Sequence, residues 1–109
     1  MKRSANGAGR VEVVERANGD AALLINGRWI EASQTQIAVL AILLDREGRV
    51  VPYEQLCRAI GHDLARRRQI HILRQYVSWA KQTLAAHNTP YTIAVVKEAG
   101  YALCPIAAH

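Results

Sequence analysis

The dipeptide Asn26-Gly27 constrains the fold of this chain more than any other feature. It joins two apolar stretches, and Asn-Gly in that setting is the strongest short-range signal for a β-hairpin, because both residues tolerate a positive φ angle. Residues 22–25 and 28–31 are therefore predicted to be antiparallel strands. Residues 11–15, which precede another turn signal, add a third strand. The N-terminal third is expected to form a small antiparallel sheet.

Helix signals begin directly after this sheet. Ser33 and Gln36 fit a capping box, in which a hydroxyl and a side-chain amide satisfy backbone donors reciprocally. Apolar residues then recur at helical spacing until Gly48 ends the first helix. A second helix is predicted with Pro52 in its first turn and Gly61 at its end.

The third predicted helix is the longest, from about residue 70 to residue 86, and a basic loop at residues 62–69 precedes it. Its apolar stripe at helical spacing is expected to face the core and comprises Ile70, Leu73, Val77, Ala80 and Leu84. The opposite face carries the polar residues His71, Arg74, Gln75, Ser78 and Gln82. A hairpin follows, with strands at residues 91–96 and 101–104.

The order of sheet, three helices and hairpin predicts an α+β fold, a winged helix-turn-helix. In that arrangement the third helix enters the major groove of DNA, and the hairpin is a wing that contacts the neighbouring backbone or the minor groove. The domain is expected to span residues 11–105. Residues 1–10, rich in Gly and Ala, are expected to be a flexible arm, and residues 106–109 a tail.

The positive charge of the chain is concentrated in one segment. Between Arg58 and Lys81 the chain has six basic residues and one acid, Asp63, for a net charge of +5, and the whole chain also carries +5. A basic helix on an otherwise balanced small protein is typical of a nucleic-acid binder, because phosphate neutralisation supplies most non-specific affinity. The alternative is a solvated, arginine-rich face that binds nothing.

Other functional classes find little support in the sequence. The apolar stretches are too short to cross a membrane, and the four histidines have no metal-ligand spacing with one another or with the cysteines. We expect no metal, no cofactor and no catalysis, since no acid–base or nucleophile pair is recognisable. Cys57 and Cys104 lie in apolar patterns and are predicted to be buried thiols of a cytoplasmic protein.

Three blocks of sequence resemble the DNA-binding domain of OmpR/PhoB-type response regulators. They are residues 40–56 (LAILLDREGRVVPYEQL), residues 73–84 (LRQYVSWAKQTL) and residues 93–103 (IAVVKEAGYAL). They occur in the family's order with compatible spacing, and the resemblance extends from Leu24 to Cys104. No receiver domain precedes this segment, so the chain is either a fragment or a stand-alone effector domain. Its Met1 favours the stand-alone domain.

The resemblance implies a set of DNA contacts. Tyr76, Ser78, Trp79 and Lys81 lie at positions that the family uses on DNA, His71 lies at its phosphate-contacting helix start, and Lys97 replaces the usual wing arginine. Charge, outward face and resemblance together predict these DNA-binding residues: Arg66, Arg67, Arg68, His71, Arg74, Gln75, Tyr76, Ser78, Trp79, Lys81, Gln82 and Lys97. Tyr76 and Trp79 flank the core stripe, so burial is the alternative for both.

The sequence also departs from the family pattern. Ser78 and Trp79 stand where the family is rich in arginine, and Glu98 replaces the first glycine of the wing, which places an acid beside Lys97. These departures leave a second function open: a protein-interaction module that contacts RNA polymerase or another regulator, with weak DNA binding. The resemblance places a polymerase contact at residues 61–69. A homodimer on double-stranded DNA is common in such systems, although no residue here marks a dimer face.

Overall fold

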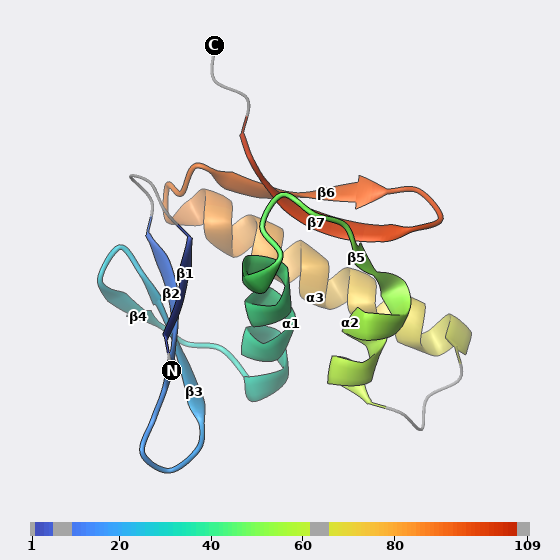
Figure 1. The fold of residues 1–109 in the computed structure, drawn as a ribbon. Coiled ribbons are helices and arrows are strands. Elements are labelled where there is room, and N and C mark those ends of the chain that lie inside the picture. Colours follow the sequence, from blue (N-terminus) through green and yellow to red (C-terminus); the bar gives the residue numbers. More distant parts are fainter. Residues whose placement is uncertain (1, 6–9, 62–65, 107–109) are drawn as a thin grey trace.

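The computed structural model describes residues 2–5, 10–61 and 66–106, with residues 2–5, 66 and 67 described through the backbone alone. The strands are β1 (Lys2–Ala5), β2 (Val11–Glu15), β3 (Ala21–Ile25), β4 (Arg28–Ile30), β5 (Val51–Pro52), β6 (Tyr91–Val96) and β7 (Gly100–Pro105). The helices are α1 (Gln34–Asp45), α2 (Tyr53–Ile60) and α3 (Arg66–Ala86). Two sheets flank the three helices, and α3 crosses behind α1 and α2 (Figure 1).

The N-terminal sheet is antiparallel with the order β1-β2-β3-β4. Asn26 and Gly27 have φ angles of 53° and 79°, which confirms the predicted hairpin between β3 and β4. The flexible arm expected at residues 1–10 is wrong for Lys2–Ala5, because this segment pairs with β2. The outer edge of β2 would otherwise present unpaired backbone donors and acceptors, and β1 satisfies them.

The start of α1 is fixed by two sets of side-chain hydrogen bonds. The Gln36 amide donates to Ser33 Oγ over 3.1 Å, and the Ser33 amide donates to Gln36 Oε1 over 2.8 Å, so the predicted capping box is confirmed. The Gln34 side chain accepts from the Ala21 amide over 2.8 Å and donates to the Ala21 carbonyl over 2.9 Å. The first turn of α1 is therefore held to the first residue of β3.

The third helix begins earlier than the sequence predicted. It starts at Arg66 and not near residue 70, so the basic loop predicted at residues 62–69 is helical from residue 66 onward. Arginine and glutamine are good helix formers, and nothing between residues 66 and 69 breaks a helix. Gln69 Nε2 donates to the Gly61 carbonyl over 2.6 Å, and this hydrogen bond connects the first turn of α3 to the end of α2. Residues 62–65 lie outside the described residues.

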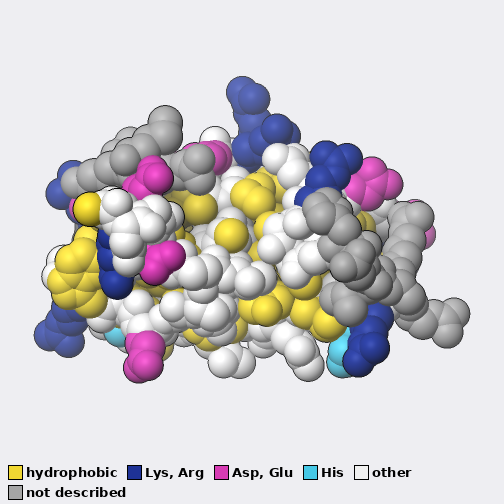
Figure 2. Space-filling view, turned by 90° about the horizontal axis from the view of Figure 1, so that it is seen from below, with side chains coloured by type: hydrophobic (Ala, Val, Ile, Leu, Met, Phe, Trp, Pro, Cys, Tyr) yellow, Lys and Arg dark blue, Asp and Glu magenta, His cyan; other side chains and the backbone are white. Residues whose placement is uncertain are grey.

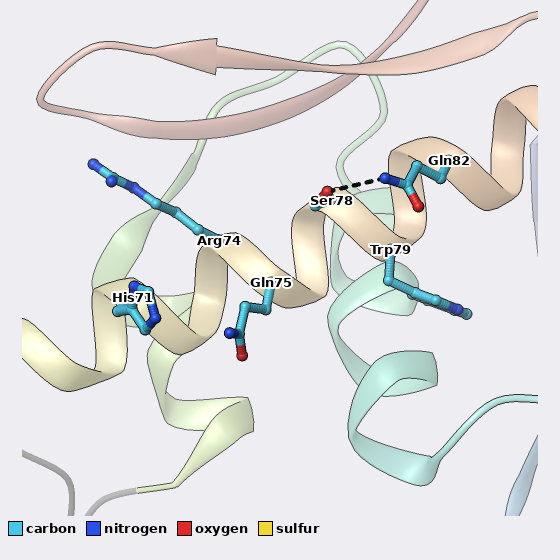
Figure 3. A pocket seen from close by; sticks show the side chains of 6 residues that line it. All are labelled: His71, Arg74, Gln75, Ser78, Trp79 and Gln82. Atoms are coloured by element: carbon cyan, nitrogen blue, oxygen red, sulfur yellow. Dashed lines mark hydrogen bonds between the residues drawn. The ribbon is translucent and has the colours of Figure 1, made fainter.

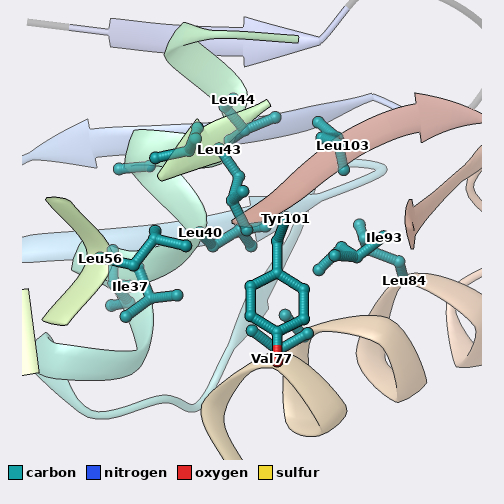
Figure 4. Close-up of a cluster of buried hydrophobic side chains, with 14 of the residues drawn as sticks. Ile37, Leu40, Leu43, Leu44, Leu56, Val77, Leu84, Ile93, Tyr101 and Leu103 are labelled. Atoms are coloured by element: carbon teal, nitrogen blue, oxygen red, sulfur yellow. The ribbon is translucent and has the colours of Figure 1, made fainter. Parts of the chain in front are cut away.

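The core lies between the helices and the two sheets (Figure 4). The predicted stripe of α3 is largely confirmed: Leu73, Val77, Ala80 and Leu84 are buried, and Ile70 is half-buried. The largest fully buried side chains are Leu23, Ile25, Leu40, Leu43, Leu56, Leu73, Leu84, Leu103, Val11, Val39 and Val51. Both halves of the chain thus contribute to one hydrophobic core.

The C-terminal sheet has the order β5-β7-β6, and the β6–β7 hairpin runs along α3 (Figure 1). Gly100 stands opposite Pro52 in the pairing of β7 with β5. A Cβ atom at Gly100 would overlap the carbonyl oxygen of Val51, so the close approach of these strands requires glycine. The tip of the hairpin lies at the same end of the molecule as the start of α3. With these elements the predicted α+β winged-helix fold is confirmed.

Candidate nucleic-acid interface

The outward face of α3 carries a shallow groove of about 450 Å³ (Figure 3). Its described lining residues are His71, Arg74, Gln75, Ser78, Trp79 and Gln82. Residues three and four apart in a helix lie on one face, so the spacing of this set places it along a single stripe. All but Trp79 are exposed, which confirms the predicted polar face of the helix.

The two edges of this groove differ in chemistry. Arg74 points toward the β6–β7 hairpin, whereas Gln75 and Trp79 point away from it (Figure 3). Lys81 lies seven residues after Arg74, on the same edge of the helix, and is exposed. Between the edges, Gln82 Nε2 donates a long hydrogen bond to Ser78 Oγ, at 3.5 Å. Basic side chains therefore mark the edge nearest the hairpin, and uncharged ones occupy the middle and the far edge.

Arg74 lies between the outward face of α3 and the C-terminal sheet. Its guanidinium lies near the Tyr101 side chain, which reaches from β7 toward α3 (Figure 4). Burial raises the pKa of Tyr101 above its usual value, Tyr53 and Cys57 raise it further, and the nearby Arg74 guanidinium opposes these effects. The ring of Tyr53 meets that of Tyr101 edge to face at 5.5 Å. The sequence did not predict this contact, because no local pattern relates α3 to β7.

Burial and the start of α3 decide the position of the other predicted residues of this helix. Tyr76 is half-buried and packs against the core, and Trp79 also packs against the core at the groove's far edge. Arg68 is exposed in the first turn of α3, while the side chains of Arg66 and Arg67 lie outside the described ones. His71 is in the second turn and not at the helix start, because α3 begins at Arg66.

The tip of the wing is built on an unusual backbone conformation. Lys97 and Glu98 are both exposed there, and Glu98 has a φ of 66°. Among the described residues, the other non-glycine residues with a positive φ are Asn26 and Asn88, and asparagine tolerates that region better than glutamate does. The glycine that the family pattern has at this position would carry no such strain. The sequence comparison identified the replacement but not its conformational cost.

The charge of the interface comes from residues 66–86, which contain five basic residues and no acid. Figure 2 views the molecule from below, and there Lys and Arg side chains stand mainly toward the rim while hydrophobic and uncharged side chains fill the middle.

Within the described chain, no group of three or more His, Cys, Asp or Glu side chains is placed to hold a metal ion. None of the described helices is long and apolar enough to cross a membrane.

Comparison with known proteins agrees with this geometry. Among curated proteins, no relative matches the chain. Residues 27–103, more than half of the 109 residues, match the family described as the C-terminal part of transcriptional regulatory proteins. The match includes β4, all three helices and most of the C-terminal sheet. The chain therefore belongs to this family of OmpR/PhoB-type DNA-binding regulatory domains.

Proposed function

We propose that this domain regulates transcription by inserting α3 into the major groove of double-stranded DNA, with the β6–β7 hairpin as the wing. One observation carries the proposal. The outward stripe of α3 is exposed over three turns, free of acids, and lined by side chains that donate and accept hydrogen bonds. Such a face suits contact with the edges of DNA bases, whose hydrogen-bonding groups lie on the floor of the major groove.

The dimensions support this docking. The stripe from His71 to Gln82 covers eleven helical steps, a length of about 16 Å. That length matches about five base pairs, and the major groove is wide enough to admit an α-helix. The tip of the β6–β7 hairpin lies at the same end of the molecule as the start of α3 (Figure 1), and Lys97 is exposed at that tip. Both observations support a contact of Lys97 with the DNA backbone beside the helix.

Phosphate contacts would come from the basic residues around the stripe. The exposed candidates with described side chains are Arg68, Arg74, Lys81 and Lys97. About four phosphate contacts give a slope of about −3.6 for the logarithm of the association constant against the logarithm of salt concentration. Binding to random duplex DNA across a salt series measures this slope directly. Absent binding, or binding that salt does not affect, would contradict the proposal.

A charge-removing pair of variants refines the same titration. Lys81→Gln removes one phosphate contact and should reduce the magnitude of the salt slope by about 0.9. Arg16→Gln is the matched control, because Arg16 is exposed after β2 in the distal N-terminal sheet. Equal changes in the two variants would mean that net charge, and not the α3 face, determines binding.

A protein-interaction module is the second candidate. It is favoured by Glu98, an exposed acid beside Lys97 that repels phosphate at the wing tip. The partner would be RNA polymerase or another regulator, contacted in part through residues 61–69, of which residues 62–65 lie outside the described residues. Affinity for such a partner without affinity for duplex DNA would support this candidate. A homodimer on DNA stays a separate prediction, tested by the stoichiometry of the complex.

A further inference from the structure

We propose that the α3 face selects A·T-rich major-groove sequence, with Gln75 and Gln82 as adenine readers and Trp79 as the contact for a thymine methyl group. The inference rests on the proposed function and specifies the substrate of that same face. The A·T preference is inferred from the hydrogen-bonding groups that the described side chains of the α3 groove contain and from those that they lack.

The groove is poor in groups that read G·C pairs. Guanine is most often read by Arg or Lys, bidentate to its O6 and N7 atoms, and cytosine by a carboxylate that accepts from N4. Arg74 is the cationic residue among the described lining residues, and its guanidinium points toward the hairpin and lies near Tyr101. Residues 66–86 contain no Asp or Glu. Along the middle of the α3 groove, the described side chains therefore include neither the cation that usually reads guanine nor the carboxylate that reads cytosine.

The groove is correspondingly well supplied for adenine. A glutamine side chain has one acceptor and an amide donor, and this pair matches the N6 donor and N7 acceptor of adenine. Gln75 is exposed on the stripe. Gln82 donates to Ser78 Oγ through one N–H, which restrains its amide, and its Oε1 atom and second N–H supply the acceptor and donor for a base. Seven residues separate the two glutamines, a rise of about 10 Å or about three base pairs.

Trp79 supplies an apolar contact at the far edge of the same groove. It is half-buried and packs against the core, so its ring is held in place before DNA binds. The thymine C5-methyl group is the apolar feature of the major-groove floor, and an apolar side chain distinguishes thymine by contacting it.

The test uses two duplexes of equal length and charge, one with a central A·T-rich block and one with a central G·C-rich block. At fixed salt, wild-type protein should bind the A·T-rich duplex at least about tenfold more tightly. Two base analogues then locate the readout in the major groove: uracil in place of thymine deletes the methyl group, and 7-deazaadenine deletes the N7 acceptor. Neither analogue changes the minor-groove edge, so a wing-based preference for A·T would not respond to them.

Variants assign each contact. Uracil should weaken wild-type binding several-fold and leave Trp79→Ala unaffected, and 7-deazaadenine should lose its effect stepwise in Gln75→Ala and Gln82→Ala. Trp29→Ala is the matched control, because Trp29 is exposed on β4 of the other sheet. Trp79→Phe keeps an apolar ring if Trp79→Ala fails to fold, and it should retain the uracil effect.

The outcomes separate this inference from the function on which it rests. Salt-dependent binding with equal affinity for the two duplexes, or with no response of wild type to either analogue, overturns the A·T inference and leaves the proposed function intact. Failure to bind any duplex overturns the proposed function itself.

Discussion

The two sheets of this domain share one core but are attached to it differently. The N-terminal sheet contacts α1 through β1 and β3, and the Asn26 side chain holds the end of the α3 region by donating to the His87 carbonyl over 2.8 Å. The C-terminal sheet lies along α3 itself, and its Tyr101 lies near Arg74 on the outward face of that helix. The first sheet therefore supports the helices, and the second is coupled to the face that we assign to DNA.

The turns of the two hairpins differ in how well their residues suit a positive φ angle. Asn26-Gly27 adopts positive φ angles with residues that suit them, whereas the wing adopts one at Glu98. Local strain in proteins persists where the surrounding structure enforces it, and it is concentrated at binding sites. The difference indicates that the wing is shaped by a requirement other than stability.

The largest expected effect contrasts a glycine from each sheet. Gly100→Ala should destabilise the domain by about 3 kcal/mol or more, because the new Cβ would overlap the Val51 carbonyl in the β5 backbone. Gly27→Ala should cost about 1 kcal/mol, because open space surrounds it and only its φ of 79° is unfavourable. Urea unfolding measures both free energies. Equal losses would mean that the two sheets tolerate substitution alike.

The second effect concerns DNA affinity. Arg74→Ala should weaken binding to a cognate duplex about tenfold, since it removes a charged contact from the groove edge. Arg16→Ala, in the distal sheet, should leave affinity unchanged. Tyr101→Phe separates the two roles of Arg74: unchanged affinity means that Arg74 contacts DNA directly, and a loss close to that of Arg74→Ala means that it acts by holding the wing. If Arg16→Ala matched Arg74→Ala, the assigned face would be wrong.

The third effect tests the strained wing. Glu98→Gly should stabilise the domain by about 0.5 kcal/mol, because relief of the positive φ exceeds the added freedom of the unfolded chain. It should also tighten DNA binding a few-fold by removing an acid beside Lys97. Glu98→Gln keeps the strain and removes the charge, so it should tighten binding without stabilising the fold. A destabilised Glu98→Gly variant would refute the strain at this position.

The smallest effect is a pH dependence of stability. Burial raises the folded-state pKa of Tyr101, and burial together with Glu47 raises that of Tyr91. Both tyrosines are protonated in both states below the usual value of about 10. Above that pH the unfolded chain ionises first, so stability should fall as pH rises toward the folded-state values. Urea unfolding of Tyr101→Phe should give a shallower decline, and an unchanged decline would remove Tyr101 from this account.

Local signals predicted most of the fold. The turn at Asn26-Gly27 and the capping box at Ser33 defined their elements closely, because each is a chemical rule acting over a few residues. The start of α3 was predicted too late, because Arg66 has no recognised capping residue before it. The strand at Lys2–Ala5 was missed because a polar segment becomes a strand here only by pairing with β2, which is a non-local interaction.

The candidate site was predicted less completely than the fold. Helical periodicity placed Gln75, Ser78 and Gln82 on the outward face, and the structure confirms their exposure. The proximity of Arg74 to Tyr101 could not be predicted, because side-chain direction across two distant elements depends on packing. The positive φ of Glu98 could not be predicted either, because the sequence identifies the residue but not its backbone angle.

The two tryptophans allow the most direct test, because one lies in each region. Trp79 is at the edge of the α3 groove, and Trp29 is 65% exposed on β4. In Trp29→Phe the remaining indole reports on the groove, and in Trp79→Phe it reports on the N-terminal sheet. With saturating duplex DNA, we expect the fluorescence of Trp79 to change and that of Trp29 to stay constant. A response from Trp29 alone would contradict the assignment of DNA binding to α3.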